Sequence, residues 1–267
     1  MDGGIDKAEI LRSVRGERSR TTAFLRTLEP EQWNTPTALP GWRIREVAAH
    51  LISLDVSALN GSILPQALSS MERLERWNDR QVGKRAGRSP TELILALERW
   101  GPRFLRLARA IPQGMYRVRV PTIWGRAPAG LLIWSRAYDE WVHRQDMRRA
   151  LGLPDESLDL ASVAGFLMRA AASEVLPKLK ERGGRVTVRL SGVPLPAFLF
   201  DLSTGALRTD PAESSADVRL RVDQPAAFIM AAAGREPSLQ ELREQGAIVV
   251  EGDDVLAKEF LERLRIV

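Results

Sequence analysis

Four long segments with helical spacing of apolar residues fill the first 152 residues, and they constrain the fold more than any other feature. Apolar side chains that recur every three or four residues form one apolar stripe along a helix. Helices of this kind bury their stripes against one another, which predicts a four-helix bundle. The expected helices cover residues 5–28, about 43–59, 90–110 and 128–151.

The third helix has the clearest sequence signal for its first residue. Residues 89–92 read Ser-Pro-Thr-Glu, which places serine at the N-cap, proline at the first helical position and glutamate at the third. Gly152 is expected to end the fourth helix. The alternating residues 116–121 predict an extended connection between these two helices. Residues 61–88 favour only short helical stretches, interrupted by Pro65.

The pattern changes after Pro154, where alternating strands follow one further helix. Strands that are followed by short capped helices predict a small α+β domain. We therefore expect two domains, residues 1–155 and 156–267. The expected elements of the second domain are a helix over 158–180, strands over 186–190, 197–202, 206–209, 216–222 and 248–250, and helices that begin at Pro225, Ser238 and Asp254.

The composition excludes several classes of function. The chain has no cysteine, so any thiol chemistry must use a small-molecule thiol. Its 39 basic and 34 acidic residues are intermixed, which indicates a solvated surface and no nucleic-acid partner. Apolar runs such as 226–233 are shorter than the ~18 residues that span a bilayer, and residues 1–20 lack an apolar signal core. We expect a cytoplasmic protein with no membrane partner.

The two histidines of the chain, His50 and His143, fall on the second and fourth expected helices. Inward-pointing histidines on different helices are a common way to build a metal site in a bundle. Asp139 precedes His143 by four residues and therefore shares its helix face. Imidazole and carboxylate ligands suit a divalent cation such as zinc. The same residues are also compatible with core histidines and a simple surface pair.

Two segments carry a resemblance to a known family. Residues 39–51 contain a Pro-Gly-Trp turn that leads into a helix with Ala-His-Leu, and residues 136–146 approach the pattern Arg-x-x-Glu-x-x-x-His-x-x-Asp. Both resemble the DinB-like metal-binding bundle, of the mycothiol-dependent maleylpyruvate isomerase type. Residues 216–218 and 250–253 resemble the sterol-carrier-protein-like domain that often follows it. The resemblance covers nearly the whole chain.

The resemblance implies that His50, Asp139 and His143 bind a divalent metal, with zinc as the default. The family usually has glutamate at the position of Asp139, so the shorter aspartate leaves Glu140 as an alternative third ligand. The resemblance further implies that the metal binds the thiol of mycothiol or a related low-molecular-weight thiol. A metal stabilises the thiolate, which then attacks a small electrophilic substrate, for isomerisation or thiol transfer.

Arg136 lies on the same helix face as Asp139 and is the predicted catalytic residue. It is expected to donate a hydrogen bond to a ligand carboxylate or to pair with an acidic substrate, and a salt bridge at the rim of the site is an equal alternative. Asp146 is expected only to brace the end of its helix. Trp42, Trp134 and Trp141 are expected to pack in the core.

Three other functions are compatible with parts of the sequence. Residues 44–51 followed by 54–57 are similar in pattern to a DNA-binding helix-turn-helix. However, the turn lacks the expected glycine, and the second segment lacks Arg and Lys. A metal-dependent hydrolase would use the same candidate ligands. A carrier of lipids or small molecules would need an apolar groove in the second domain. The candidate lining residues could equally form an ordinary core, and they are Val193, Leu195, Phe198, Phe200 and Phe228.

Overall fold

The computed structural model describes residues 5–62, 70–158, 160–209 and 216–266. The chain forms two compact units. One contains Asp6–Ile123 and Pro128–Asp155, and the other contains the chain from Glu156 onward together with Ile5 and Trp124–Ala127. The domain limits drawn from the sequence stay a prediction.

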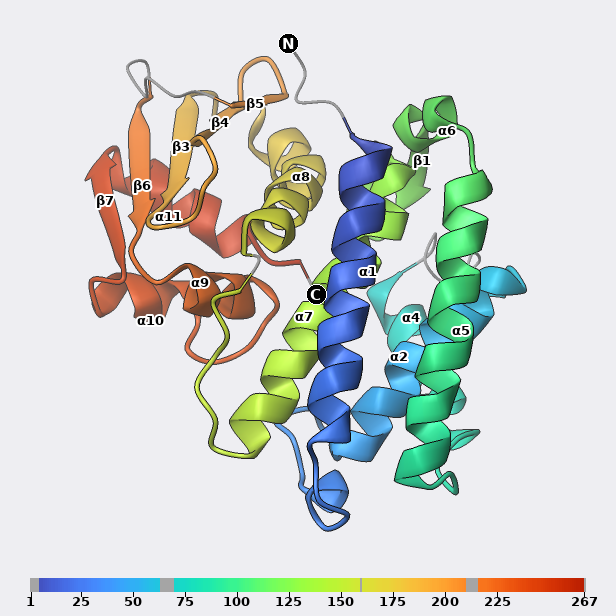
Figure 1. Cartoon of the computed structure of the whole chain (residues 1–267). Coiled ribbons are helices and arrows are strands. Elements are labelled where there is room, and N and C mark those ends of the chain that lie inside the picture. Colours follow the sequence, from blue (N-terminus) through green and yellow to red (C-terminus); the bar gives the residue numbers. More distant parts are fainter. Residues whose placement is uncertain (1–4, 63–69, 159, 210–215, 267) are drawn as a thin grey trace. The chain divides into compact units, whose positions relative to one another are not determined.

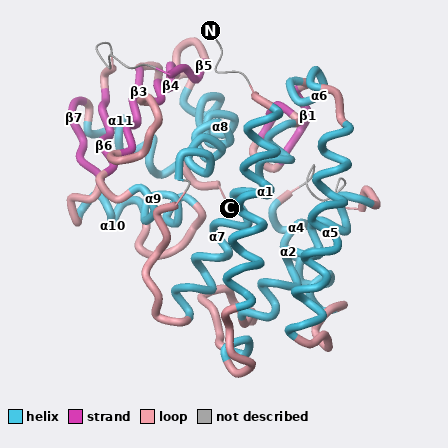
Figure 2. The backbone as a smooth tube through the Cα atoms, viewed as in Figure 1, coloured by secondary structure: helices cyan, strands magenta, loops and turns pink. Residues whose placement is uncertain are grey.

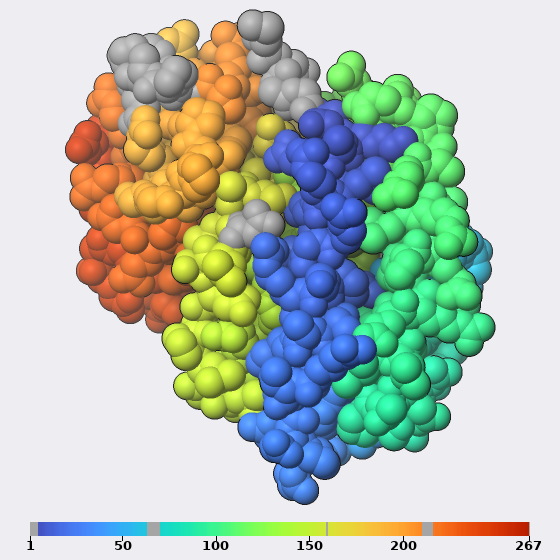
Figure 3. Space-filling model, in the orientation of Figure 1, coloured from blue at the N-terminus to red at the C-terminus, as the bar shows by residue number. Residues whose placement is uncertain are grey.

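The first unit is a helical bundle, as the sequence predicts. Its long helices are α1 (Lys7–Arg26), α2 (Ile44–Leu59), α5 (Pro90–Ala110) and α7 (Gly130–Ala150). Helix α1 packs against α5 and α7, and α2 packs against the same two helices (Figure 1). Figure 3 shows the side chains of α1 in direct contact with those of α5. The bundle is therefore closed by contacts between helices that are distant in sequence.

The expected capping box of α5 is confirmed. The Ser89 hydroxyl accepts a hydrogen bond from the Glu92 backbone N–H, and the Glu92 carboxylate accepts one from the Ser89 backbone N–H at 2.7 Å. These two bonds satisfy amide groups that the first turn of a helix leaves unpaired. The Ser89 amide lowers the pKa of the Glu92 carboxyl because it stabilises the charged form.

The connections between the long helices differ from the sequence prediction in two places. Residues 116–121 are not wholly extended, because α6 (Gln113–Arg117) precedes the hairpin of β1 (Arg119–Thr122) and β2 (Gly125–Pro128). Burial explains the extra helical turn: Tyr116 is 1% exposed, and its hydroxyl donates to the Ala108 carbonyl at 2.8 Å.

In the described part of the ambiguous region, residues 61–62 and 70–88, lies the helix α4 (Met71–Gly83), which packs on α2. The expected break at Pro65 lies outside the described residues. A short 3-10 turn, Gln32–Asn34, follows α1. The helix-turn-helix alternative is wrong, because α2 continues from Ile44 to Leu59 without a turn.

The second unit is a small α+β fold, which confirms the predicted fold class (Figure 2). Its five-stranded sheet has the order β5-β4-β3-β6-β7, in which β3 and β6 are parallel and the other neighbours are antiparallel. Helix α8 packs on β4 and β5, and α11 packs on β6 and β7. The elements are α8 (Leu160–Leu179), β3 (Arg185–Leu190), β4 (Phe198–Asp201), β5 (Ala206–Thr209), β6 (Val218–Val222), α9 (Pro225–Ala232), α10 (Leu239–Glu244), β7 (Ile248–Gly252) and α11 (Asp254–Arg263).

Gly252 shows why one residue of the sterol-carrier-like segment must be glycine. It has a φ of +103°, and a Cβ at this position would collide with the carbonyl oxygen of Asp217 on the neighbouring strand. The Asp253 side chain then accepts a hydrogen bond from the Leu256 backbone N–H and caps α11. The sheet edge and the start of the last helix are therefore fixed together.

The apolar residues proposed for a carrier groove mostly belong to the core. Phe198, Phe200 and Phe228 are 2%, 0% and 0% exposed, and Val193 is also buried. Only Leu195 is partly exposed. Their burial is what an ordinary α+β core requires.

Helix α8 contradicts the expectation that no segment has the length and apolarity of a membrane span. Leu160–Leu179 meets that criterion, with a mean hydropathy of 1.2 over 18 residues. However, 67% of this window is buried inside the structure. The helix is apolar on most of its surface because α9, α11 and the sheet pack around it.

Replacing Ser89 by Ala removes the capping hydroxyl of α5 and should lower the free energy of unfolding by about 1 kcal/mol. Denaturant titration of both proteins measures the difference. The variant Ser89→Asp keeps a capping acceptor and should unfold within about 0.5 kcal/mol of the wild type. Equal losses for both variants would contradict the role of the cap.

Candidate functional site

His50 and His143 meet inside the bundle. Their ring centroids are 4.9 Å apart with an interplanar angle of 79°, and the residues are 5% and 9% exposed. At this separation, one nitrogen from each ring can approach a common ion at about 2.1 Å. The two helices that carry them, α2 and α7, are neighbours in the bundle. The structure therefore brings together the two imidazoles that the sequence singled out.

The orientation of the His143 ring is fixed by Asp146. The His143 Nδ1 atom lies 3.0 Å from Asp146 Oδ2, and both groups are buried. An ionised carboxylate can only accept, so Nδ1 is the donor, and in the neutral ring Nε2 keeps its lone pair. Metal-binding histidines are commonly oriented by such a carboxylate. The sequence prediction missed this contact when it assigned Asp146 only to the helix end.

Trp42 lies against both imidazoles. Its ring centroid is 5.1 Å from that of His50 and 6.5 Å from that of His143, and its indole N–H donates to Asp79 of α4 at 3.2 Å. Gly41 allows the tight turn before it, with a φ of +75°. Trp42 is half-buried and packs on the core as expected, but the sequence did not reveal its contact with the histidines. Trp134 and Trp141 are core residues, at 1% and 0% exposed.

Asp139, the predicted third ligand, is paired with Arg136. Arg136 Nη1 donates to Asp139 Oδ2 at 3.0 Å, and the Asp139 side chain is 32% exposed. Desolvation raises the pKa of the Asp139 carboxyl, while the nearby Arg136 and His143 oppose this effect. Within the described ranges, no three histidine, aspartate or glutamate side chains are grouped so that they could hold an ion together.

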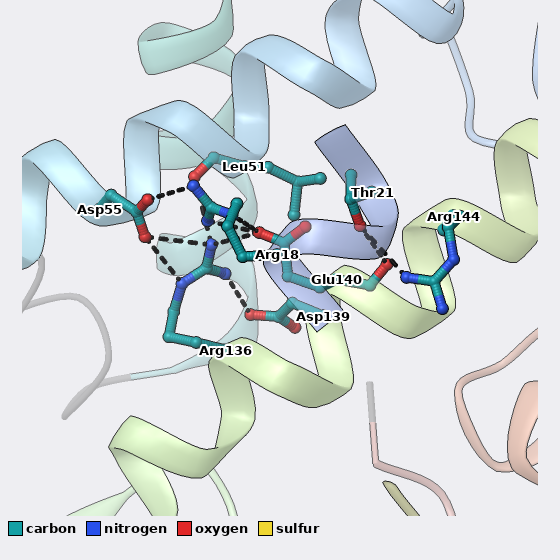
Figure 4. Close-up of polar contacts among 8 residues, drawn as sticks. All are labelled: Arg18, Thr21, Leu51, Asp55, Arg136, Asp139, Glu140 and Arg144. Atoms are coloured by element: carbon teal, nitrogen blue, oxygen red, sulfur yellow. Dashed lines mark hydrogen bonds and ion pairs between the residues drawn. The ribbon is translucent and has the colours of Figure 1, made fainter. Parts of the chain in front are cut away.

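A buried network of ion pairs surrounds Arg136 and connects three helices (Figure 4). Arg18 of α1 bonds to Asp55 of α2 and to Glu140 of α7. Arg136 donates to the same Asp55 and Glu140 carboxylates at 3.4 Å, and to the Leu51 carbonyl at 3.2 Å. The Asp55 and Glu140 side chains are fully buried. Each carboxylate is thus shared between two guanidinium groups.

A second set of contacts extends the network along α1 and α7. Arg144 Nη2 donates to Glu17 at 2.7 Å, and Arg144 Nη1 donates to the Thr21 hydroxyl at 3.2 Å. Both charged side chains of this pair are fully buried. Burial lowers the pKa of Arg18, but Asp55 and Glu140 outweigh this effect and raise it above its usual value. The charges are therefore stable only as a paired set.

The network includes Glu140 and Arg136, two residues that the sequence analysis assigned to the site. Glu140, the alternative third ligand, is instead engaged with Arg18 and Arg136 in the core. Arg136 is 4% exposed, and its partners are protein carboxylates and one carbonyl. The expected hydrogen bond to the Asp139 carboxylate is present. The contacts of Arg136 are those of a residue that positions neighbouring carboxylates. A catalytic role for Arg136 stays a prediction.

Comparison with known proteins identifies a matching family and similar solved structures. The family model described as the mycothiol maleylpyruvate isomerase N-terminal domain matches residues 14–148, which include both histidines and the whole buried network. The match covers half of the chain, and the chain belongs to this family. No curated protein sequence matches the chain significantly.

Solved structures support the same fold over nearly the whole chain. The crystal structure of a mycothiol-dependent maleylpyruvate isomerase has a TM-score of 0.53 and 17% identity, over 92% of this chain and 93% of that one. A mutant of a mycothiol-dependent maleylpyruvate isomerase matches with a TM-score of 0.52 over the same shares. A sterol carrier protein 2 like 2 from Aedes aegypti covers 36% of this chain at 18% identity, but its TM-score of 0.25 is too low to carry an argument.

Replacing Glu140 by Gln should destabilise the bundle by about 3–5 kcal/mol, because it leaves two buried guanidinium groups with too little negative charge. Thermal or denaturant unfolding measures the loss. The control is Glu98→Gln, which removes an exposed ion pair with Arg26 and should cost less than about 1 kcal/mol. Similar losses in the two variants would show that the buried network contributes no more than a surface pair.

Proposed function

We propose that this chain is a thiol-dependent enzyme of the isomerase type, which uses mycothiol or a related low-molecular-weight thiol on a small electrophilic substrate. The observation that carries the proposal is the pair of buried imidazoles, 4.9 Å apart on helices distant in sequence. Membership in the mycothiol maleylpyruvate isomerase family supports it. The absence of cysteine fits a reaction whose sulfur comes from a cosubstrate.

The residues of the site fit a divalent metal in part. His50 and His143 would hold it, with zinc as the default. Asp146 engages the Nδ1 atom of His143, which leaves the Nε2 atom available for the metal. We propose Asp139 as the third ligand, although it must exchange its contact with Arg136 for the metal. A divalent cation bound there would keep a thiol cosubstrate in the thiolate form at neutral pH.

The remaining side chains would prepare the site for this chemistry. Trp42 covers one side of the two imidazoles and excludes water from them. Arg136 holds the carboxylate of Asp139 and anchors it to the buried network. The network keeps α2 and α7 in a fixed rotation, so that the imidazoles stay together when the ligands change.

The fate of the carbon–sulfur bond distinguishes isomerisation from transfer. A thiolate that adds to an electrophilic double bond forms a carbon–sulfur bond while the π bond breaks, and the π electron pair moves onto the electron-withdrawing group of the substrate. The carbon–carbon bond is then single and can rotate. If the same carbon–sulfur bond then breaks, the thiol is regenerated and the product is an isomer of the substrate. If another group leaves instead, the product is a thioether and one thiol is consumed. A cytoplasmic location stays a prediction.

Wild-type protein should retain close to one divalent metal ion per chain, whereas His50→Ala and His143→Ala should retain little, because each loses one imidazole ligand. Elemental analysis after gel filtration measures this. Asp146→Asn should weaken metal affinity by about 10–100-fold, since it removes the carboxylate that orients His143. Equal metal content in wild type and both alanine variants would remove the metal site.

Incubation with mycothiol and an electrophilic cis-alkene acid should isomerise the acid without net loss of thiol. The free thiol is counted by a colorimetric reagent, and the acid is followed by its absorbance. Stoichiometric loss of thiol would indicate a transferase, and turnover without thiol would indicate a hydrolase or another reaction of the metal site. No turnover in any of these mixtures would favour a carrier.

A further inference from the structure

Arg85 is a half-buried arginine at the end of α4 that has only neutral partners. Its Nη1 atom donates to the Ser53 hydroxyl at 2.9 Å and to the Gln81 carbonyl at 3.0 Å. Over the residues that the structure describes, no carboxylate pairs with it. This differs from the buried arginines of the network, each of which has at least one carboxylate partner.

The unused part of the Arg85 side chain has a specific shape. Both of its hydrogen bonds use Nη1, so the edge formed by Nε and Nη2 contacts no acceptor within the described part of the chain. This edge presents two parallel N–H donors, which match the two oxygens of one carboxylate. A guanidinium that is partly withdrawn from water gains more from an anion than an exposed one does.

Arg85 is connected to the helix that carries His50. Its partner Ser53 is three residues after His50 on α2, so the two side chains are neighbours on one helix face. The Ser53 hydroxyl donates to the Ala49 carbonyl at 2.7 Å, which fixes it as an acceptor for Arg85. Asp79, also on α4, holds Trp42 against His50. Helix α4 therefore contributes the acceptor that holds Trp42, and the segment just after it contributes a cation bonded to the helix of His50.

We propose that Arg85 binds the carboxylate of an acidic substrate through its Nε–Nη2 edge and thereby directs the substrate's reactive carbon toward the histidine pair. Arg85 is then the residue that selects substrates with a carboxylate at a set distance from the electrophilic carbon. This inference rests on the proposed function, because it assigns a role to the same site.

The electrostatic surroundings of Arg85 support this assignment. Burial lowers the pKa of the Arg85 guanidinium, and the neighbouring Arg88 adds to the effect. A bound carboxylate would relieve both unfavourable contributions, desolvation and like-charge repulsion. A purely structural arginine in this position would be expected to have an acidic partner, as Arg18 and Arg136 have.

The test measures succinate binding to the full-length, metal-free protein by isothermal titration calorimetry. Succinate carries carboxylates and no electrophile, and dimethyl succinate is the uncharged control. Wild type should bind succinate and not the diester. Arg85→Gln should bind at least about tenfold more weakly, and Arg85→Lys, which keeps the charge but loses the paired donors, should fall between them. The matched control Arg88→Gln removes an exposed neighbour and should change affinity by less than about threefold.

The outcomes separate this inference from the proposed function. Wild type that fails to bind succinate, or Arg85→Gln with unchanged affinity, would overturn the role of Arg85. Because metal is absent from the assay, a protein that binds succinate at Arg85 but retains no metal would keep this inference and lose the metal site. If Arg85→Gln does not fold, the comparison of Arg85→Lys with Arg88→Gln decides, and equal affinities would overturn the proposal.

Discussion

The pairing of buried charge is the constraint on which the bundle depends. Arg18, Asp55, Arg136 and Glu140 come from three helices, and no one of them could remain charged in the core alone. Their contacts allow only one rotation of each helix about its own axis. His143 follows Glu140 by three residues on α7, so the rotation that pairs the charge also aims the imidazole.

The same constraint explains the position of Asp139. Arg136 has carboxylates on several sides, and Asp139 is the one nearest to solvent. The resemblance seen in the sequence implies a glutamate at this position. The aspartate is one methylene shorter, and in this structure it contacts the arginine. Metal binding by Asp139 would therefore compete with an existing ion pair. The two imidazoles are the main observation behind the proposed metal site, and the carboxylate would adjust its affinity.

The sequence predicted the parts of the structure that have local signals. Capping at Ser89 and apolar periodicity located the long helices, and the scarcity of histidine pointed to His50 and His143. The buried network was not predictable, because Arg18 is 37 residues from Asp55 and 122 from Glu140 and no local pattern links them. The contact of Trp42 with the two histidines, and the position of Arg85, were missed for the same reason. The expectation that no segment is long and apolar enough to span a membrane was wrong for α8, whose apolar window is mostly buried in the core.

X-ray absorption at the zinc edge tests the central claim, that the histidine pair binds a metal which in turn binds the thiol. Zinc-loaded protein alone should show only nitrogen and oxygen ligands at about 2.0–2.1 Å. Because the chain has no cysteine, any thiolate ligand must come from added thiol. Addition of mycothiol should introduce a sulfur neighbour at about 2.3 Å. A metal shell that stays free of sulfur at saturating thiol would contradict the account.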